Sequence, residues 1–287
     1  MTIRNACRNI SGAYDSGSFR LEGWRDYIDR EVPGARELCE RDVRECIDGG
    51  LSWENDYLPV LDAAYRETGQ REKALESFRL VTDGLDERIS SRFGKTLDTE
   101  IVIYLGLCNG AGWVTGLNGR TAVLLGIEKI VELGWTGTDD MYGLILHELG
   151  HVWQDRYGVL SRSLDDPGDS FLWQLFTEGV AMVFEQETVG DTGYYHQDRN
   201  GWACWCEGHL GELIRDFEAD RRTMTRTDQR YFGDWASYHG RPDTGYYLGA
   251  RLVRFMMRHD AFDSILNYEI GSVREAYGAF ARTFERK

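Results

Sequence analysis

The feature that most constrains this chain is the stretch His147-Glu148-Leu149-Gly150-His151, which has the pattern H-E-x-x-H. Residues four apart lie on the same face of an α-helix, so a helix here places the imidazoles of His147 and His151 where both can bind one cation. Glu148 lies one step round the helix, from which it can reach a water on that cation without becoming a ligand of the same face. The pattern therefore predicts a metal site with an acid–base carboxylate beside it.

The flanking residues favour a helix over this stretch. An apolar run from Met141 to Leu146 leads into the motif, and Asp139-Asp140 places carboxylates at the expected N-terminus. Gly158 comes where such a helix should stop. A chance match at three positions is the alternative, and this helical context argues against it.

Two histidines leave a metal ion in need of a third protein ligand, and Glu178 is our prediction. Catalytic zinc sites have three protein ligands and keep the fourth position for water, whose pKa falls to about 7. Glu178 and Glu185 interrupt the apolar set of a helix expected at 170–187, seven residues apart and hence on one face. A glutamate on a largely apolar helix needs a partner, and a metal ion is a good one. We therefore predict one Zn²⁺ ion per chain on His147, His151 and Glu178.

Other carboxylates compete for the third position or support the ligands. Asp155 continues the face of the two histidines by one turn, where it can orient an imidazole or a water but is poorly placed to close the coordination sphere. Asp165 and Asp166, in a loop expected at 158–170, are the remaining rivals. Glu185 is the expected supporting carboxylate on the second helix.

The composition narrows the class of protein. The chain has 287 residues with 42% hydrophobic content, as ordered globular proteins do. A formal net charge of −15 argues against a nucleic-acid partner, because phosphate contacts need clustered lysine and arginine. No segment approaches the roughly 18–20 apolar residues of a membrane span, and the first residues lack the apolar region of a signal peptide. We expect no membrane partner and a cytoplasmic location, and no oligomeric state is predicted.

The six cysteines are scattered, which is typical of free thiols in a reducing compartment. Cys204-Trp205-Cys206 is the one close pair. Metal binding or oxidation at this pair is the lesser alternative, because no second pair stands at zinc-site spacing.

The order of elements predicts an α+β fold. Residues 1–96 are expected to form a helical N-terminal region, and residues 97–287 a domain with a small sheet, the motif helix and a second ligand helix, packed with that region as one unit. Strands are expected at 99–105 and 120–127, with a turn at Asn118-Gly119. The strand before the motif helix offers an exposed edge for an extended peptide. Alternatively, residues 101–127 are a hairpin buried against the helix.

A late helix, expected from Gly245 to about Arg258, carries candidate substrate contacts. Tyr246, or failing it Tyr247, can donate its hydroxyl to a zinc-bound oxyanion. Arg251 can hold a substrate carboxylate. An aromatic pair in the core is the competing interpretation for the two tyrosines. The histidines of the preceding segment are expected to be ordinary surface or packed residues: His196, His209 and His239.

His147 to His151 and the segment Thr177-Glu178-Gly179-Val180-Ala181 together resemble the gluzincin group of zinc metallopeptidases. In that group the third ligand is a glutamate in a pattern close to N-E-G-x-A on the second helix, and Glu185 matches a further acid often seen there. The stretch Gly245-Tyr246-Tyr247-Leu248-Gly249 also resembles a bacterial family of predicted zinc-dependent proteases known as a domain of unknown function. The similarity covers residues 99–260.

The resemblance implies a zincin-like fold for residues 97–287 in a mostly helical α+β protein. It also implies hydrolysis of peptide bonds in a peptide or protein substrate, with Glu148 as general base and Tyr246 as oxyanion stabiliser. The chain departs from the group in two respects. The spacing from His151 to Glu178 is longer than in thermolysin or the aminopeptidases, and Gly126-Ile127-Glu128-Lys129 is only a faint echo of the exopeptidase signature G-x-M-E-N. Two other functions stay open: a zinc-containing binding or regulatory protein, and a metal hydrolase for non-peptide amides or esters.

Overall fold

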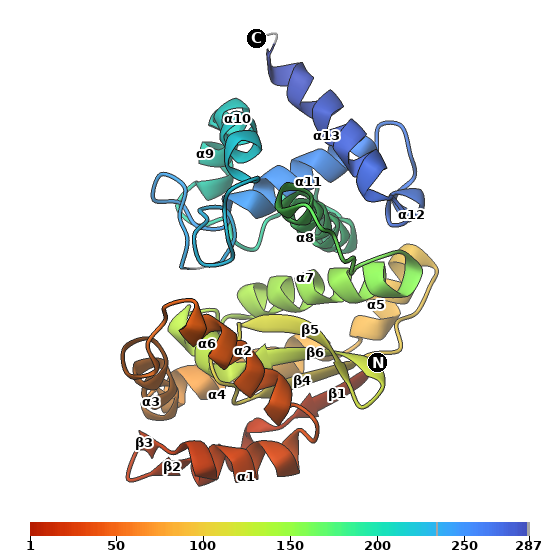
Figure 1. The fold of residues 1–287 in the computed structure, drawn as a ribbon. Coiled ribbons are helices and arrows are strands. Elements are labelled where there is room, and N and C mark those ends of the chain that lie inside the picture. Colours follow the sequence, from red (N-terminus) through yellow and green to blue (C-terminus); the bar gives the residue numbers. More distant parts are fainter. Residues whose placement is uncertain (234, 286–287) are drawn as a thin grey trace. The chain divides into compact units, whose positions relative to one another are not determined.

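A computed structural model of the chain describes residues 1–233 and 235–285, which divide into two units between Glu148 and Leu149. The architecture is mostly helical α+β, as predicted, with a four-stranded mixed sheet and a small two-stranded hairpin (Figure 1). The dividing point falls inside one continuous helix, α7 (Thr138–Tyr157), which carries the H-E-x-x-H motif. The domain boundary predicted near residue 97 is not tested by this division and stays a prediction.

The sheet of the first unit has the strand order β1-β4-β6-β5. Its strands are β1 (Thr2–Asn5), β4 (Glu100–Tyr104), β6 (Arg120–Gly126) and β5 (Gly112–Leu117). The first three run parallel, and β5 pairs antiparallel with β6. Apolar side chains along β4 and β6 are buried on both faces, which is why these two runs were recognisable as strands.

The structure corrects two expectations about this sheet. The strand just before the motif helix, β6, lies between β4 and β5, so its edges are already paired; β5 is the edge strand instead. Residues 101–127 are not a single hairpin, because β4 and β6 are parallel and only β5 and β6 form a hairpin. Asn118 and Gly119 form its turn, both with positive φ, as expected of an Asn-Gly hairpin turn.

The rest of the first unit is mainly helical. The helices before α7 are α1 (Leu21–Glu31), α2 (Arg36–Asp48), α3 (Leu58–Arg66), α4 (Thr68–Thr82), α5 (Leu85–Phe93) and α6 (Ile127–Glu132), with the short helices η1 (Cys7–Ala13) and η2 (Trp53–Tyr57). The hairpin pairs β2 (Tyr14–Asp15) with β3 (Ser18–Phe19). Most of residues 21–93 are helical, in line with the expected helical N-terminal region, whereas Thr2–Asn5, Tyr14–Asp15 and Ser18–Phe19 are strands. Pro59 lies in the first turn of α3.

The second unit is helical apart from one isolated bridge among its described residues. Its helices after α7 are α8 (Pro167–Val189), α9 (Trp202–Gly208), α10 (Leu210–Asp220), α11 (Thr244–Met256), α12 (Phe262–Ile265) and α13 (Ile270–Glu285). Helices α8 and α11 lie against each other at its centre (Figure 1). No described helix is long and apolar enough to cross a membrane. None of the six cysteines forms a disulfide bond.

Candidate metal centre

Helix α7 forms where the sequence predicts it. Asp139 and Asp140 lie in its first turn, and its apolar side chains are buried, among them Trp153 at 0% exposure. The helix ends at Tyr157, immediately before Gly158. Here glycine is required by packing, because a Cβ on Gly158 would lie 2.2 Å from the carbonyl oxygen of Leu266.

Helix α8 begins with a side-chain cap and continues for 23 residues. The Asp166 carboxylate accepts a hydrogen bond from the backbone N–H of Asp169 at 2.9 Å, and Pro167 fills the first turn, where it lacks no hydrogen bond. Asp166, one of the rival ligands, therefore acts as a cap. The helix ends at Gly190 in the left-handed conformation.

Small residues in the two motifs bring α7 and α8 close together within the second unit. A Cβ on Gly150 would lie 2.6 Å from the Cα of Ala181. Because Gly150 immediately precedes His151 and Ala181 is three residues after Glu178, this close approach places the two ligand candidates opposite each other. His151 Nε2 lies 3.3 Å from Glu178 Oε2.

The three predicted ligands form one cluster. The possible ligand atoms of His147, His151 and Glu178 all lie within 4.8 Å of one another. His147 is one helical turn before His151 on α7 and is 5% exposed, while the side chains of His151 and Glu178 are 13% and 15% exposed. The structure therefore confirms a buried group of two histidines and a glutamate that could hold a metal ion.

The donor set fits a divalent transition-metal ion. Imidazole nitrogens and a carboxylate oxygen are the donors that zinc takes in catalytic sites. Ligand atoms at 2.0–2.1 Å around a tetrahedral ion lie about 3.3–3.4 Å apart. The separation of His151 Nε2 and Glu178 Oε2, 3.3 Å, matches this distance between ligand atoms.

A second cluster shares His147. The possible ligand atoms of His147, Glu185 and His196 also lie within 4.8 Å of one another. Glu185 is fully buried, and one residue engages both of its oxygens: His196 Nδ1 lies 2.9 Å from Oε2, and the backbone N–H of His196 donates to Oε1 at 3.2 Å. The chain turns back after Gly190, which brings His196 to α8. Sequence reasoning treated His196 as ordinary, because a histidine in a loop without periodicity carries no signal.

Glu148 is held against the edge strand of the first unit. It is 6% exposed, and a Cβ built on Gly112 would lie 2.7 Å from its Cγ and 2.7 Å from its Oε1. Only a glycine at the first position of β5 permits this contact. The glutamate of the H-E-x-x-H motif therefore lies beside the edge strand β5.

The remaining predicted residues have neighbours of their own. Tyr247 and Arg251 both contact Glu207, and Arg251 also donates to the Tyr247 hydroxyl at 3.1 Å. Burial raises the pKa of Tyr247 above its ordinary value, helped by the hydrogen bond to Glu207. Tyr246 is half-buried with its ring edge against Phe232, and Asp155 is exposed on α7.

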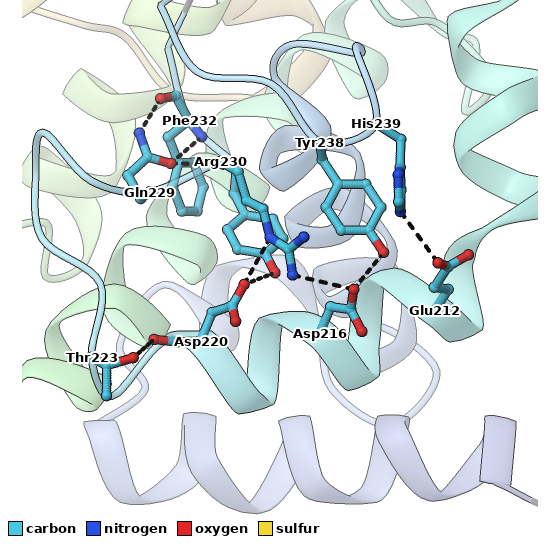
Figure 2. A network of polar contacts seen from close by, with 10 residues as sticks. Glu212, Asp216, Asp220, Thr223, Gln229, Arg230, Phe232, Tyr238 and His239 are labelled. Atoms are coloured by element: carbon cyan, nitrogen blue, oxygen red, sulfur yellow. Dashed lines mark hydrogen bonds and ion pairs between the residues drawn. The ribbon is translucent and has the colours of Figure 1, made fainter.

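A third group of possible ligands in the second unit consists of Glu212 and Asp216 on α10 and His239 in the segment before α11. Figure 2 shows that Asp216 already faces a cation. Arg230 lies 3.2 Å from Asp216 and 2.8 Å from Asp220, and Tyr238 donates to Asp216 at 2.9 Å. The Arg230 guanidinium already supplies positive charge to these carboxylates, so this group is a weaker metal-site candidate than the two that contain His147. The network connects the loop before α11 to α10.

No protein-family model matches the chain, and the comparisons with curated proteins and with solved structures gave no match either. The assignment of a function therefore rests on the site itself.

Proposed function

We propose that the chain is a zinc-dependent peptidase with a zincin-like catalytic arrangement. The observation that carries this proposal is the position of Glu148, which lies between the two histidines of the metal cluster in sequence and against Gly112 of the edge strand β5 in space. An unpaired strand edge can bind an extended peptide through main-chain hydrogen bonds. Such a peptide on β5 would run next to the carboxylate that must act on it.

The residues have distinct roles in this proposal. His147, His151 and Glu178 would hold the zinc ion, which when bound supplies a Lewis acid that polarises a carbonyl and lowers the pKa of water to about 7. Glu148 accepts the proton of the attacking water and passes it to the leaving amine, as a general base and then a general acid. Tyr246 is proposed to stabilise the developing oxyanion with its hydroxyl.

Glu185 and His196 are proposed to support the ligands. Histidine ligands of metal ions usually donate their second ring nitrogen to a carboxylate, which fixes the orientation of the ring. Glu185 is in the cluster with His147, and His196 holds both of its oxygens. His196 would thus keep the carboxylate turned toward the ligand.

A peptide-library digest tests the proposal. We expect the zinc-loaded protein to cleave peptides, and the Glu148→Gln variant to retain zinc while its kcat falls by at least about 10²-fold, because the amide cannot accept the proton. Glu132→Gln, an exposed glutamate in the same unit, is the control. Turnover retained in Glu148→Gln would contradict the mechanism. If the protein cleaves only esters or non-peptide amides, it is a metal hydrolase of another class and not a peptidase.

A further inference from the structure

The first unit contains a buried carboxylate that the proposed mechanism does not use. Glu128, in the first turn of α6, is 1% exposed. Its Oε2 accepts the backbone N–H of Gly106 at 2.9 Å, and its Oε1 accepts that of Cys108 at 3.0 Å. A buried charge needs such partners, and here both belong to the loop between β4 and β5.

This loop leads directly to the glycine that touches Glu148. A Cβ on Gly126 would lie 2.6 Å from the Gly110 carbonyl oxygen and 3.0 Å from Glu128 Oε1, so loop, strand β6 and carboxylate are in close contact. The backbone N–H of Gly126 donates to the Ala111 carbonyl at 3.0 Å. The next residue, Gly112, begins β5 and packs on Glu148.

We infer that Glu128 is a positioning residue: it holds the loop of residues 106–111 and thereby keeps Gly112 at the contact that orients Glu148. The catalytic consequence rests on the proposed peptidase function, whereas the effect on the loop does not. Glu128 does not bind substrate, because its carboxylate is buried and occupied by backbone donors. Glu128, the acid in the faint match of residues 126–129 to an exopeptidase signature, therefore has a structural role: it binds the backbone of this loop.

The charge of Glu128 has two opposing effects on its buried site. Burial raises the pKa of its carboxyl from 4.5 to about 7, against the lowering effect of the backbone N–H groups and Lys129. Protonation weakens one of the two backbone contacts, but it also removes the cost of burying a charge, and the raised pKa shows that the second effect is the larger. A cavity of about 210 Å³ with an apolar lining lies between α3 and α6, and Glu128 is one of its lining residues.

Other titratable groups around Glu128 belong to several elements. The thiols and phenols among them remain protonated near neutral pH, because burial raises the pKa of each. These are Cys7 on η1, Tyr14 on β2, Tyr27 on α1, Cys39 on α2 and Tyr104 on β4, and the charged group that acts on Glu128 is Lys129 on α6.

Glu128→Gln tests the inference, with Glu132→Gln on the same helix as the matched control. Glutamine keeps the size of the side chain but directs an N–H₂ group toward a backbone N–H donor. Hydrogen–deuterium exchange of residues 105–117, expressed as protection factors, should show lower protection in Glu128→Gln at pH 8. The control should follow wild type.

The kinetic measurement separates positioning from general stability. With zinc content unchanged, we expect kcat of Glu128→Gln to fall about 10-fold to 100-fold and KM to stay within about twofold, because the base is misplaced while binding persists. Unchanged protection in Glu128→Gln would overturn the inference. If wild type cleaves no peptide, the peptidase proposal fails, and the exchange experiment still decides whether Glu128 holds the loop.

Discussion

At the scale of single residues, the candidate centre depends on two glycines that permit close contacts. Gly150 lets α7 approach Ala181 on α8, and Gly112 makes room for the Glu148 side chain. Neither glycine has a positive φ, so both are required by space and not by backbone conformation. A methyl group at either position would displace a chemical group of the site.

Gly112→Ala should lower kcat by about 10-fold to 100-fold with zinc retained, because the new Cβ would force the Glu148 carboxylate out of position. Gly116→Ala is the matched control on the same strand, since a Cβ there meets nothing within 4 Å. Steady-state kinetics with zinc determination checks both variants. Equal kcat in the two would show that the Gly112 contact does not orient the base.

The residues of the site were predictable to the extent that they lie on helices. The spacing of His147 and His151, together with an acid on an apolar helix, was enough to select Glu178. His196 was missed, because it reaches Glu185 through an irregular loop and no periodicity connects them. The hold of Glu128 on two loop amides was equally invisible, since tertiary contacts set it.

At the scale of elements, helix packing in the second unit is controlled by glycine contacts. A Cβ on Gly179 would lie 2.2 Å from the Gly249 carbonyl oxygen, and one on Gly249 would lie 2.4 Å from that of Leu175. Helices α8 and α11 therefore touch through their backbones. The glycine after Glu178 in the second motif is thus explained by packing.

Gly179→Ala should destabilise the fold by about 1–3 kcal/mol, because backbone atoms must move to admit the methyl group. Gly271→Ala in α13 is the counterpart: nothing lies within 4 Å of its added Cβ, so we expect a gain of about 0.4–1 kcal/mol from the lower entropy of the unfolded chain. Urea unfolding measures both. A Gly179→Ala variant as stable as wild type would contradict the close packing.

The elements that could be predicted from the sequence were long helices with periodic apolar residues and strands with a buried apolar run: α7, α8, β4 and β6. Strand β1 was missed because its four residues contain a single apolar side chain, Ile3, and its pairing with β4 is a long-range contact. Strand β5 was missed because it contains two glycines, Gly112 and Gly116, and glycine is typical of turns. Its role at the sheet edge follows from topology, which no local pattern specifies.

At the scale of the whole molecule, the buried carboxyl of Glu128 affects how stability depends on pH. Its pKa is about 7 in the folded state and 4.5 is the ordinary value, so between these pH values the unfolded chain releases the proton first. The contribution of Glu128 to the free energy of unfolding is therefore fully present below pH 4.5 and is lost as the pH rises through 7. The sign is opposite to that of a carboxylate in a salt bridge.

Unfolding free energies from pH 4.5 to 8 should show this loss in wild type and not in Glu128→Gln. We expect the difference between the two proteins to change by about 3 kcal/mol across the range and to level off above pH 7. Subtraction cancels the other carboxylates, which are common to both. A difference independent of pH would mean that Glu128 titrates at its ordinary value.

The metal site is the central claim, and zinc content by inductively coupled plasma mass spectrometry tests it most directly. Wild type, Glu178→Ala and Glu185→Ala would be compared after zinc reconstitution, with Glu187→Ala as control, because Glu187 lies on the same helix and pairs with Arg254. We predict about one zinc ion per chain in wild type and Glu187→Ala, weaker binding in Glu185→Ala by about 10-fold to 100-fold, and loss in Glu178→Ala. Zinc retained in Glu178→Ala but lost in Glu185→Ala would contradict the assignment and move the ion to His147, Glu185 and His196.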